Sequence, residues 1–209
     1  MDQQSESNPA QDEPGAAPSE RQPVQQSARQ RSHKRPKDIR ELCYPFIYET
    51  QFQCDYEIAT DELCCQVGGV MAMLPVERSE AVAAVFGDLD QLQRLIYNLN
   101  GSVRGRLGIF EEDMAWLKAR YDFYNEASRG RVTGFVLPRG PQPIPALHLC
   151  RCASKKVVRL LVRLEESGVQ YDPILPRFAN LLANFFFVLT VFLKQEWQVP
   201  EVSYVSINY

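Results

Sequence analysis

One stretch near the C-terminus restricts the possible folds most strongly, because residues 178–193 are apolar except for Asn180, Asn184 and Thr190. A helix of these sixteen residues would be about 24 Å long, short of the roughly 30 Å of a bilayer core. Two asparagines in its first half further disfavour insertion into lipid. A helix that is apolar on nearly every side is instead surrounded by protein. We therefore expect this segment at the centre of a helical bundle or in a subunit interface, with no membrane partner.

Four further segments carry apolar residues at helical spacing. They predict helices from Tyr56 to Leu74, from about Ser79 to Asn100, from about Ile109 to Ala127 and from about Ala146 to Ser167, and the apolar stretch extends to a fifth helix from about Pro173 to Trp197. Pro75 and Gly168 end two of these helices. The simplest arrangement that buries five such stripes is an all-α fold, a five-helix up-and-down bundle.

The N-terminal segment has a different composition. Residues 1–43 contain no aromatic side chain, and acidic residues precede a basic group that ends in the cluster from His33 to Lys37. Such a segment cannot bury enough apolar surface to offset the entropy of ordering. We expect a disordered tail over 1–43, a bundle over 44–198 and an extended C-terminal tail over 199–209. No mitochondrial presequence or secretory signal is evident, which predicts a cytoplasmic or nuclear protein.

The charge and the cysteines exclude some classes of site. A net charge of -3 does not by itself demand nucleic acid as a partner. The adjacent pair Cys64 and Cys65, and the pair Cys150 and Cys152, lack the spacing that lets two thiolates share one zinc ion. We expect reduced, mostly buried thiols and no metal site.

The fourth predicted helix carries a line of positive charge. Its members are His148, Arg151, Lys155, Arg159 and Arg163, which fall within about 120° of one another on a helical wheel. This face is either a solvated surface or an anion site, because stacked cations without an intervening acid repel one another unless a ligand or water screens them. Together with the basic N-terminal segment, it could also bind nucleic acid or another polyanion.

Three sequence motifs occur in a family order. Residues 135–140 read F-V-L-P-R-G and residues 146–151 read A-L-H-L-C-R, followed by Lys155, Lys156 and Arg159. Residues 60–63 read T-D-E-L, with Gly68 after them, and residues 180–189 read N-L-L-A-N-F-F-F-V-L. Together these motifs resemble those of the PduO-type ATP:cob(I)alamin adenosyltransferases over residues 56–193.

The resemblance implies a five-helix bundle that assembles as a homotrimer, with active sites between subunits. In that family a loop of the pattern T-K-T-G-D-x-G-x-T holds the ATP triphosphate with magnesium, and helix arginines neutralise it. Matching positions here make Arg151, Lys155, Lys156, Arg159, Asn180 and Asn184 remnants of a nucleotide site, and make Asp61, Glu62 and His148 part of the family fold motif.

The chain departs from the family at positions of the reaction chemistry. The loop pattern does not occur, and residues 35–54 contain no glycine, although phosphate-binding loops depend on close backbone approach. Lys155 and Lys156 replace arginines, Val158 replaces a glutamate, and Asn184 replaces an aspartate. Loss of one well-placed electrostatic contact typically slows catalysis by about 10²- to 10³-fold, so several losses leave little activity.

The leading hypothesis is therefore a non-catalytic relative that acts as an oligomeric protein-interaction scaffold, with no expected catalytic residue or cofactor. An unidentified protein would bind its tails or bundle surface. The first alternative is an active or weak adenosyltransferase that uses ATP, magnesium and cobalamin. The second alternative is a protein that binds nucleic acid or another polyanion.

Overall fold

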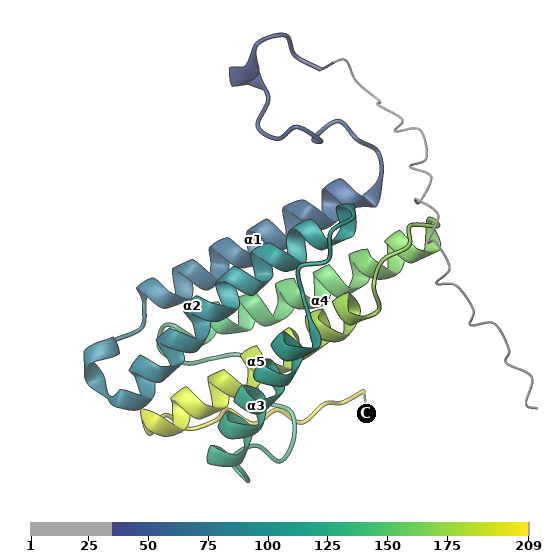
Figure 1. Ribbon diagram of the computed structural model, residues 1–209. Coiled ribbons are helices and arrows are strands. Elements are labelled where there is room, and N and C mark those ends of the chain that lie inside the picture. Colours follow the sequence, from purple (N-terminus) through teal and green to yellow (C-terminus); the bar gives the residue numbers. More distant parts are fainter. Residues whose placement is uncertain (1–34, 209) are drawn as a thin grey trace, which may run out of the picture.

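The computed structural model describes residues 35–208, which form five α-helices and three short 3-10 helices (Figure 1). The α-helices are α1 (Phe52–Ala72), α2 (Glu80–Gly101), α3 (Glu111–Ala127), α4 (Ile144–Glu166) and α5 (Ile174–Glu196). The 3-10 helices are η1 (Ile39–Glu41), η2 (Val76–Arg78) and η3 (Ser102–Arg104). The predicted all-α fold is confirmed. Residues 1–34, and with them most of the predicted tail, lie outside the described residues.

Two helix starts differ from the predictions. α1 begins at Phe52 and α4 begins at Ile144, each before its expected first residue. Pro145 therefore lies inside the first turn of α4. A proline is tolerated there because the first N–H groups of a helix have no helical acceptor. The start of α2 follows the prediction, since the Ser79 hydroxyl accepts a hydrogen bond from the Val82 N–H at 3.2 Å.

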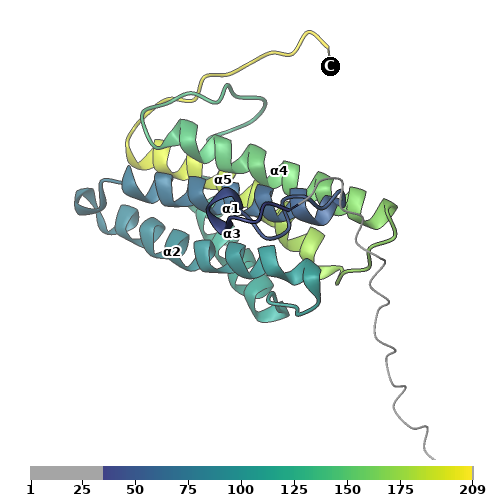
Figure 2. The ribbon, with the colours of Figure 1, turned by 90° about the horizontal axis from the view of Figure 1, so that it is seen from above.

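The apolar helix α5 lies at the centre of the bundle, where it contacts α4, α3 and, to a smaller extent, α2. α1 packs against both α2 and α4, and Figure 2 shows this arrangement from above. Phe178, Phe185 and Phe186 are fully buried, and each such side chain stabilises the fold by about 1.5–3 kcal/mol. Of the two expected positions for α5, the structure shows the bundle centre.

α5 is also the one helix within residues 35–208 that is long and apolar enough to span a bilayer. However, 67% of its most apolar window is buried inside the protein, as expected for the core helix of a bundle. The expectation for the cysteines is half wrong, because Cys54, Cys64 and Cys150 are buried, whereas Cys43, Cys65 and Cys152 are exposed.

The segments that follow α3 and α5 meet each other outside the helical core. Val136, in the loop between α3 and α4, forms an isolated antiparallel bridge with Ser203 in the C-terminal segment. Gly140 in the same loop has φ = 153°, a conformation that L residues with a side chain rarely adopt. Both views show this loop and the yellow C-terminal segment next to each other (Figures 1 and 2).

Candidate functional site

A pocket of about 290 Å³ lies where α4 faces α5. α4 contributes His148, Arg151 and Lys155, α5 contributes Ala183, Asn184 and Phe187, and the loop before α4 contributes Gly134, Phe135 and Val136. His148, Arg151 and Lys155 point into the same pocket because residues three and four apart share a helix face. The pocket thus gathers four predicted site residues: His148, Arg151, Lys155 and Asn184.

His148 is the most deeply buried polar residue of the pocket, with 5% of its surface exposed. Neither its Nδ1 nor its Nε2 atom has a hydrogen-bond partner. Burial, together with the positive charges of Arg151 and Lys194, lowers the pKa of His148 to about 4. At neutral pH the imidazole is therefore uncharged, with one nitrogen able to donate and the other able to accept. Unpaired buried nitrogens are costly, and a polar ligand or water in the pocket would satisfy them.

Arg151 and Lys155 give the pocket its charge. Arg151 is half-buried and its Nε atom is buried without a partner, whereas Lys155 is exposed one helical turn further along. None of the nine described residues that line the pocket is acidic. The site therefore favours an anion, and the guanidinium offers several donors for its oxygens. Its volume is at the lower end of ligand pockets, which measure about 300–1,000 Å³, so it suits a small anion or one end of a larger ligand.

The other predicted nucleotide-site residues do not line this pocket. Asn180 donates a hydrogen bond to the Pro176 carbonyl of its own helix at 2.8 Å. Lys156 Nζ lies 3.9 Å from a carboxylate oxygen of Glu62 on α1, and Arg159 is exposed on α4. Lys156 thus lies beside an acid from the neighbouring helix.

The predicted fold-motif residues on α1 also lie away from the pocket. Asp61 accepts a hydrogen bond from the Tyr97 hydroxyl of α2 at 3.2 Å, and Glu62 accepts one from Gln66 at 3.0 Å. Asp61 therefore links α1 to α2. His148, the third fold-motif residue, is the one that belongs to the pocket.

A second polar cluster closes the segment that precedes α1. Arg104 of η3 donates from Nη1 to Glu49 at 3.0 Å and from Nη2 to Glu57 of α1 at 2.6 Å. Its guanidinium carbon lies 3.9 Å from the ring centre of Phe46, within the range of a cation–π contact. Both glutamate side chains are 5% exposed. Arg104 therefore ties the segment before α1 both to α1 and to η3.

Comparison with known proteins agrees with the resemblance in the sequence. Residues 56–193 match the family model described as cobalamin adenosyltransferase. The chain belongs to the cobalamin adenosyltransferase family. The corrinoid adenosyltransferase of Bacillus subtilis (strain 168) is 24% identical over 149 residues, which cover 69% of this chain and 75% of the relative. The corrinoid adenosyltransferase MMAB of Bos taurus is 32% identical over 73 residues, which cover 35% of this chain and 30% of the relative.

Solved structures of the family show the same fold. A variant PduO-type ATP:corrinoid adenosyltransferase from Lactobacillus reuteri, complexed with cobalamin and ATP, superposes with a TM-score of 0.67. The two chains are 22% identical, and the match covers 76% of this chain and 86% of the relative. Another variant from the same organism, complexed with ATP, also gives a TM-score of 0.67, at 22% identity over 76% of this chain and 90% of the relative.

Phe135 and Phe187 line the pocket without having been predicted as binding residues. Phe187 lies three residues after Asn184 on α5, which places both side chains on one helix face. Phe135 begins the F-V-L-P-R-G motif and is 61% exposed. Helical spacing from a predicted polar residue would have found Phe187, whereas Phe135 reaches the site only through the fold of its loop.

Proposed function

We propose that this family member binds a nucleoside triphosphate at the pocket around His148 but does not transfer the adenosyl group, and that it acts as an oligomeric scaffold. The observation that carries the proposal is the contrast between two regions. The pocket combines unpaired buried nitrogens with positive charge, whereas residues 35–51, which precede α1, contain no glycine and place Glu49 against Arg104. One half of a triphosphate site is therefore kept and the other half is replaced.

The pocket fits part of ATP and the Arg104 cluster does not. The Arg151 guanidinium and Lys155 ammonium attract phosphate oxygens, and neutral His148 can donate one hydrogen bond. The Glu49 and Glu57 carboxylates are engaged by Arg104, and residues 35–54 contain no glycine for a loop of the phosphate-binding type. A triphosphate bound beside that cluster would approach two carboxylates, which opposes the approach that adenosyl transfer needs.

An oligomer completes the proposal in two ways. A pocket of about 290 Å³ holds only part of ATP, so a second wall from another copy of the chain would enclose the remainder. Phe135 lines the pocket and is 61% exposed, so it gives the pocket rim an apolar surface that a neighbouring subunit would cover. The trimer itself is proposed from membership in the family.

Titration with ATP and magnesium tests the binding step. Isothermal titration calorimetry should give a micromolar dissociation constant for the wild-type chain, and Arg151→Ala should weaken it by at least about tenfold, because a charged hydrogen bond contributes about 1.5–3 kcal/mol. Arg159→Ala is the matched control, since Arg159 lies on the same helix but does not line the pocket. Absence of binding, or equal losses in both variants, would refute the nucleotide site.

A second candidate function is adenosyl transfer to cobalamin, as an active or weak enzyme. It is favoured by the pocket and by the relatives, which are ATP:corrinoid adenosyltransferases with solved complexes of cobalamin and ATP. These complexes also remove support for the expectation that no cofactor binds. The exposed Phe135 ring offers an apolar surface to a large planar ligand.

Incubation of the protein with ATP, magnesium and chemically reduced cob(I)alamin separates the two candidates. The leading proposal expects ATP binding without formation of adenosylcobalamin. Formation of adenosylcobalamin is monitored by its absorbance spectrum. Product that forms with the wild-type chain and is lost in Arg151→Ala would establish the second candidate instead. Light scattering tests the scaffold separately, because a monomer at micromolar concentration would contradict it.

A further inference from the structure

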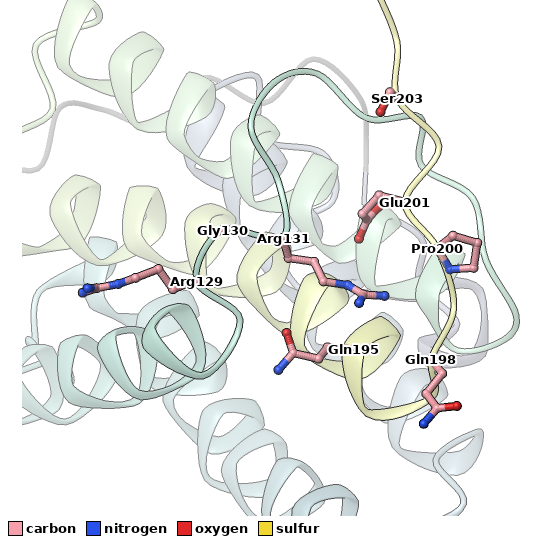
Figure 3. A pocket seen from close by; sticks show the side chains of 8 residues that line it. All are labelled: Arg129, Gly130, Arg131, Gln195, Gln198, Pro200, Glu201 and Ser203. Carbon is pink, nitrogen blue, oxygen red and sulfur yellow. The ribbon is translucent and has the colours of Figure 1, made fainter.

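The segment that follows α5 is attached close to the pocket at three points. The Arg131 Nη2 atom, at the start of the loop between α3 and α4, donates to the Val199 carbonyl at 2.6 Å. Lys194, near the end of α5, forms an ion pair with Glu201 at 2.6 Å. Figure 3 shows Arg131 and Glu201 facing the same open groove of about 730 Å³. The C-terminal segment is therefore bound to the core as well as to the loop.

The third attachment lies at the edge of the pocket. The Leu137 N–H donates to the Val202 carbonyl and the Tyr204 N–H donates to the Phe135 carbonyl, both at 2.8 Å. These two bonds flank the antiparallel bridge between Val136 and Ser203. Phe135 and Val136 line the pocket themselves. The C-terminal segment is thus paired with the pocket wall along its backbone.

The ion pair between Lys194 and Glu201 connects this pairing to the inside of the bundle. The Lys194 side chain is 1% exposed and that of Glu201 is 9% exposed. A buried ammonium needs a counter-charge, because an isolated charge in an apolar interior is strongly unfavourable. Lys194 also lies close enough to His148 to lower the pKa of its imidazole. Glu201 therefore anchors the C-terminal segment to the buried end of α5, close to His148 of the pocket.

We propose that residues 201–204 act as a clamp that positions the Phe135 edge of the ligand pocket, with Glu201 as the positioning residue that anchors the clamp to α5. The inference rests on the proposed nucleotide pocket for its functional consequence. The loop between α3 and α4 contains Pro138, Pro141 and Pro143, which cannot donate backbone hydrogen bonds. Pairing with the C-terminal segment supplies the order that the loop needs to form a defined wall.

A proline substitution removes one clamp bond without touching the core. Tyr204→Pro deletes the N–H that donates to Phe135, and Tyr204 is 46% exposed. Val205→Pro is the matched control, because Val205 is 85% exposed and lies just beyond the bridge. Hydrogen exchange measured by mass spectrometry should be faster for residues 134–138 in Tyr204→Pro and unchanged in Val205→Pro. Affinity for ATP with magnesium should fall by about three- to tenfold, the effect of one net hydrogen bond.

Variants at Glu201 test the anchor. Glu201→Gln removes the counter-charge of Lys194 but keeps an acceptor, whereas Glu201→Ala removes both, so exchange in residues 134–138 should accelerate in both variants and more strongly in the alanine variant. Should Glu201→Ala fail to fold, Tyr204→Pro decides the question. Exchange rates of these residues that stay at wild-type values in both Tyr204→Pro and a folded Glu201→Ala would overturn the clamp. Lack of ATP binding by the wild-type chain refutes the proposed function, while the exchange experiment still decides the clamp.

Discussion

Replacement of Arg104 by methionine gives the sharpest test of the cluster that closes the segment before α1. The guanidinium bonds to both Glu49 and Glu57, whose side chains are 5% exposed. Methionine keeps much of the apolar stem but supplies no donor or charge. Arg104→Met therefore removes the guanidinium that both buried carboxylates contact.

The expected loss follows from the burial. Removing one partner of a buried ion pair typically costs about 3–5 kcal/mol, and loss of the contact with Phe46 adds up to about 1 kcal/mol. A small domain has about 5–15 kcal/mol of stability in total. For a chain of this size the melting temperature should fall by roughly 6–24 °C, at about 2–4 °C per kcal/mol.

Urea unfolding followed by circular dichroism at pH 7 measures this loss. Arg94→Met is the matched control, because Arg94 pairs with Asp90 one turn away and its side chain is 75% exposed; such pairs contribute only about 0.3–0.5 kcal/mol. Combining Arg104→Met with Glu57→Gln should recover part of the loss, since one buried charge is then removed. If Arg104→Met costs no more than Arg94→Met, the cluster is not the electrostatic anchor that the geometry indicates.

Three further predictions concern the core and the pocket. Folded His148 has a pKa of about 4, whereas unfolded His148 takes up its proton near pH 6.5, so the free energy of unfolding should fall by up to about 3 kcal/mol as pH drops through this window. Urea titrations at pH 7 and pH 4.5 should show that His148→Gln removes this pH-dependent part. An unchanged pH dependence in the variant would contradict the prediction. The buried Tyr56 hydroxyl donates to the Leu99 carbonyl at 2.8 Å, so Tyr56→Phe should lower the free energy of unfolding by about 1–3 kcal/mol; a neutral result would show that water replaces the bond. Gly140 has φ = 153°, and a Cβ added there would lie 3.1 Å from two Ile144 carbons, so Gly140→Ala should lower the melting temperature. Gly134→Ala is the control and should leave the melting temperature unchanged, because a Cβ at Gly134 would have nothing within 4 Å.

The five helices could be predicted because apolar residues recur at helical spacing within each of these segments. The positions of apolar residues, the Ser79 cap and the breaks at Pro75 and Gly168 depend on neighbours within one or two turns. The missed starts of α1 and α4 have a local reason as well, since the first turn of a helix tolerates residues that its interior does not. The central place of α5 follows from its composition, because only contact with other helices covers a surface that is apolar on nearly every side.

The pocket was predicted in part. His148, Arg151 and Lys155 share a face of α4, so spacing alone placed them together. Asn180 was assigned to the same site as Asn184, but its amide bonds to its own helix. The resemblance made Lys156 a remnant of the nucleotide site, and Glu62 of α1 lies beside it. Neither residue lines the pocket, because spacing within one helix does not say which face its neighbours cover.

The amino-acid sequence by itself determined the helices, their apolar faces and the family to which the chain belongs, because these depend on short-range periodicity and on motifs read along the chain. Only the tertiary structure decided which cations face a pocket and which meet an acid, how Arg104 joins Glu49 to Glu57, and that Glu201 reaches Lys194. Each of these pairs joins separate elements, so the packing of the helices and loops, which no local pattern encodes, sets the distances that give the groups their charge state and their partners.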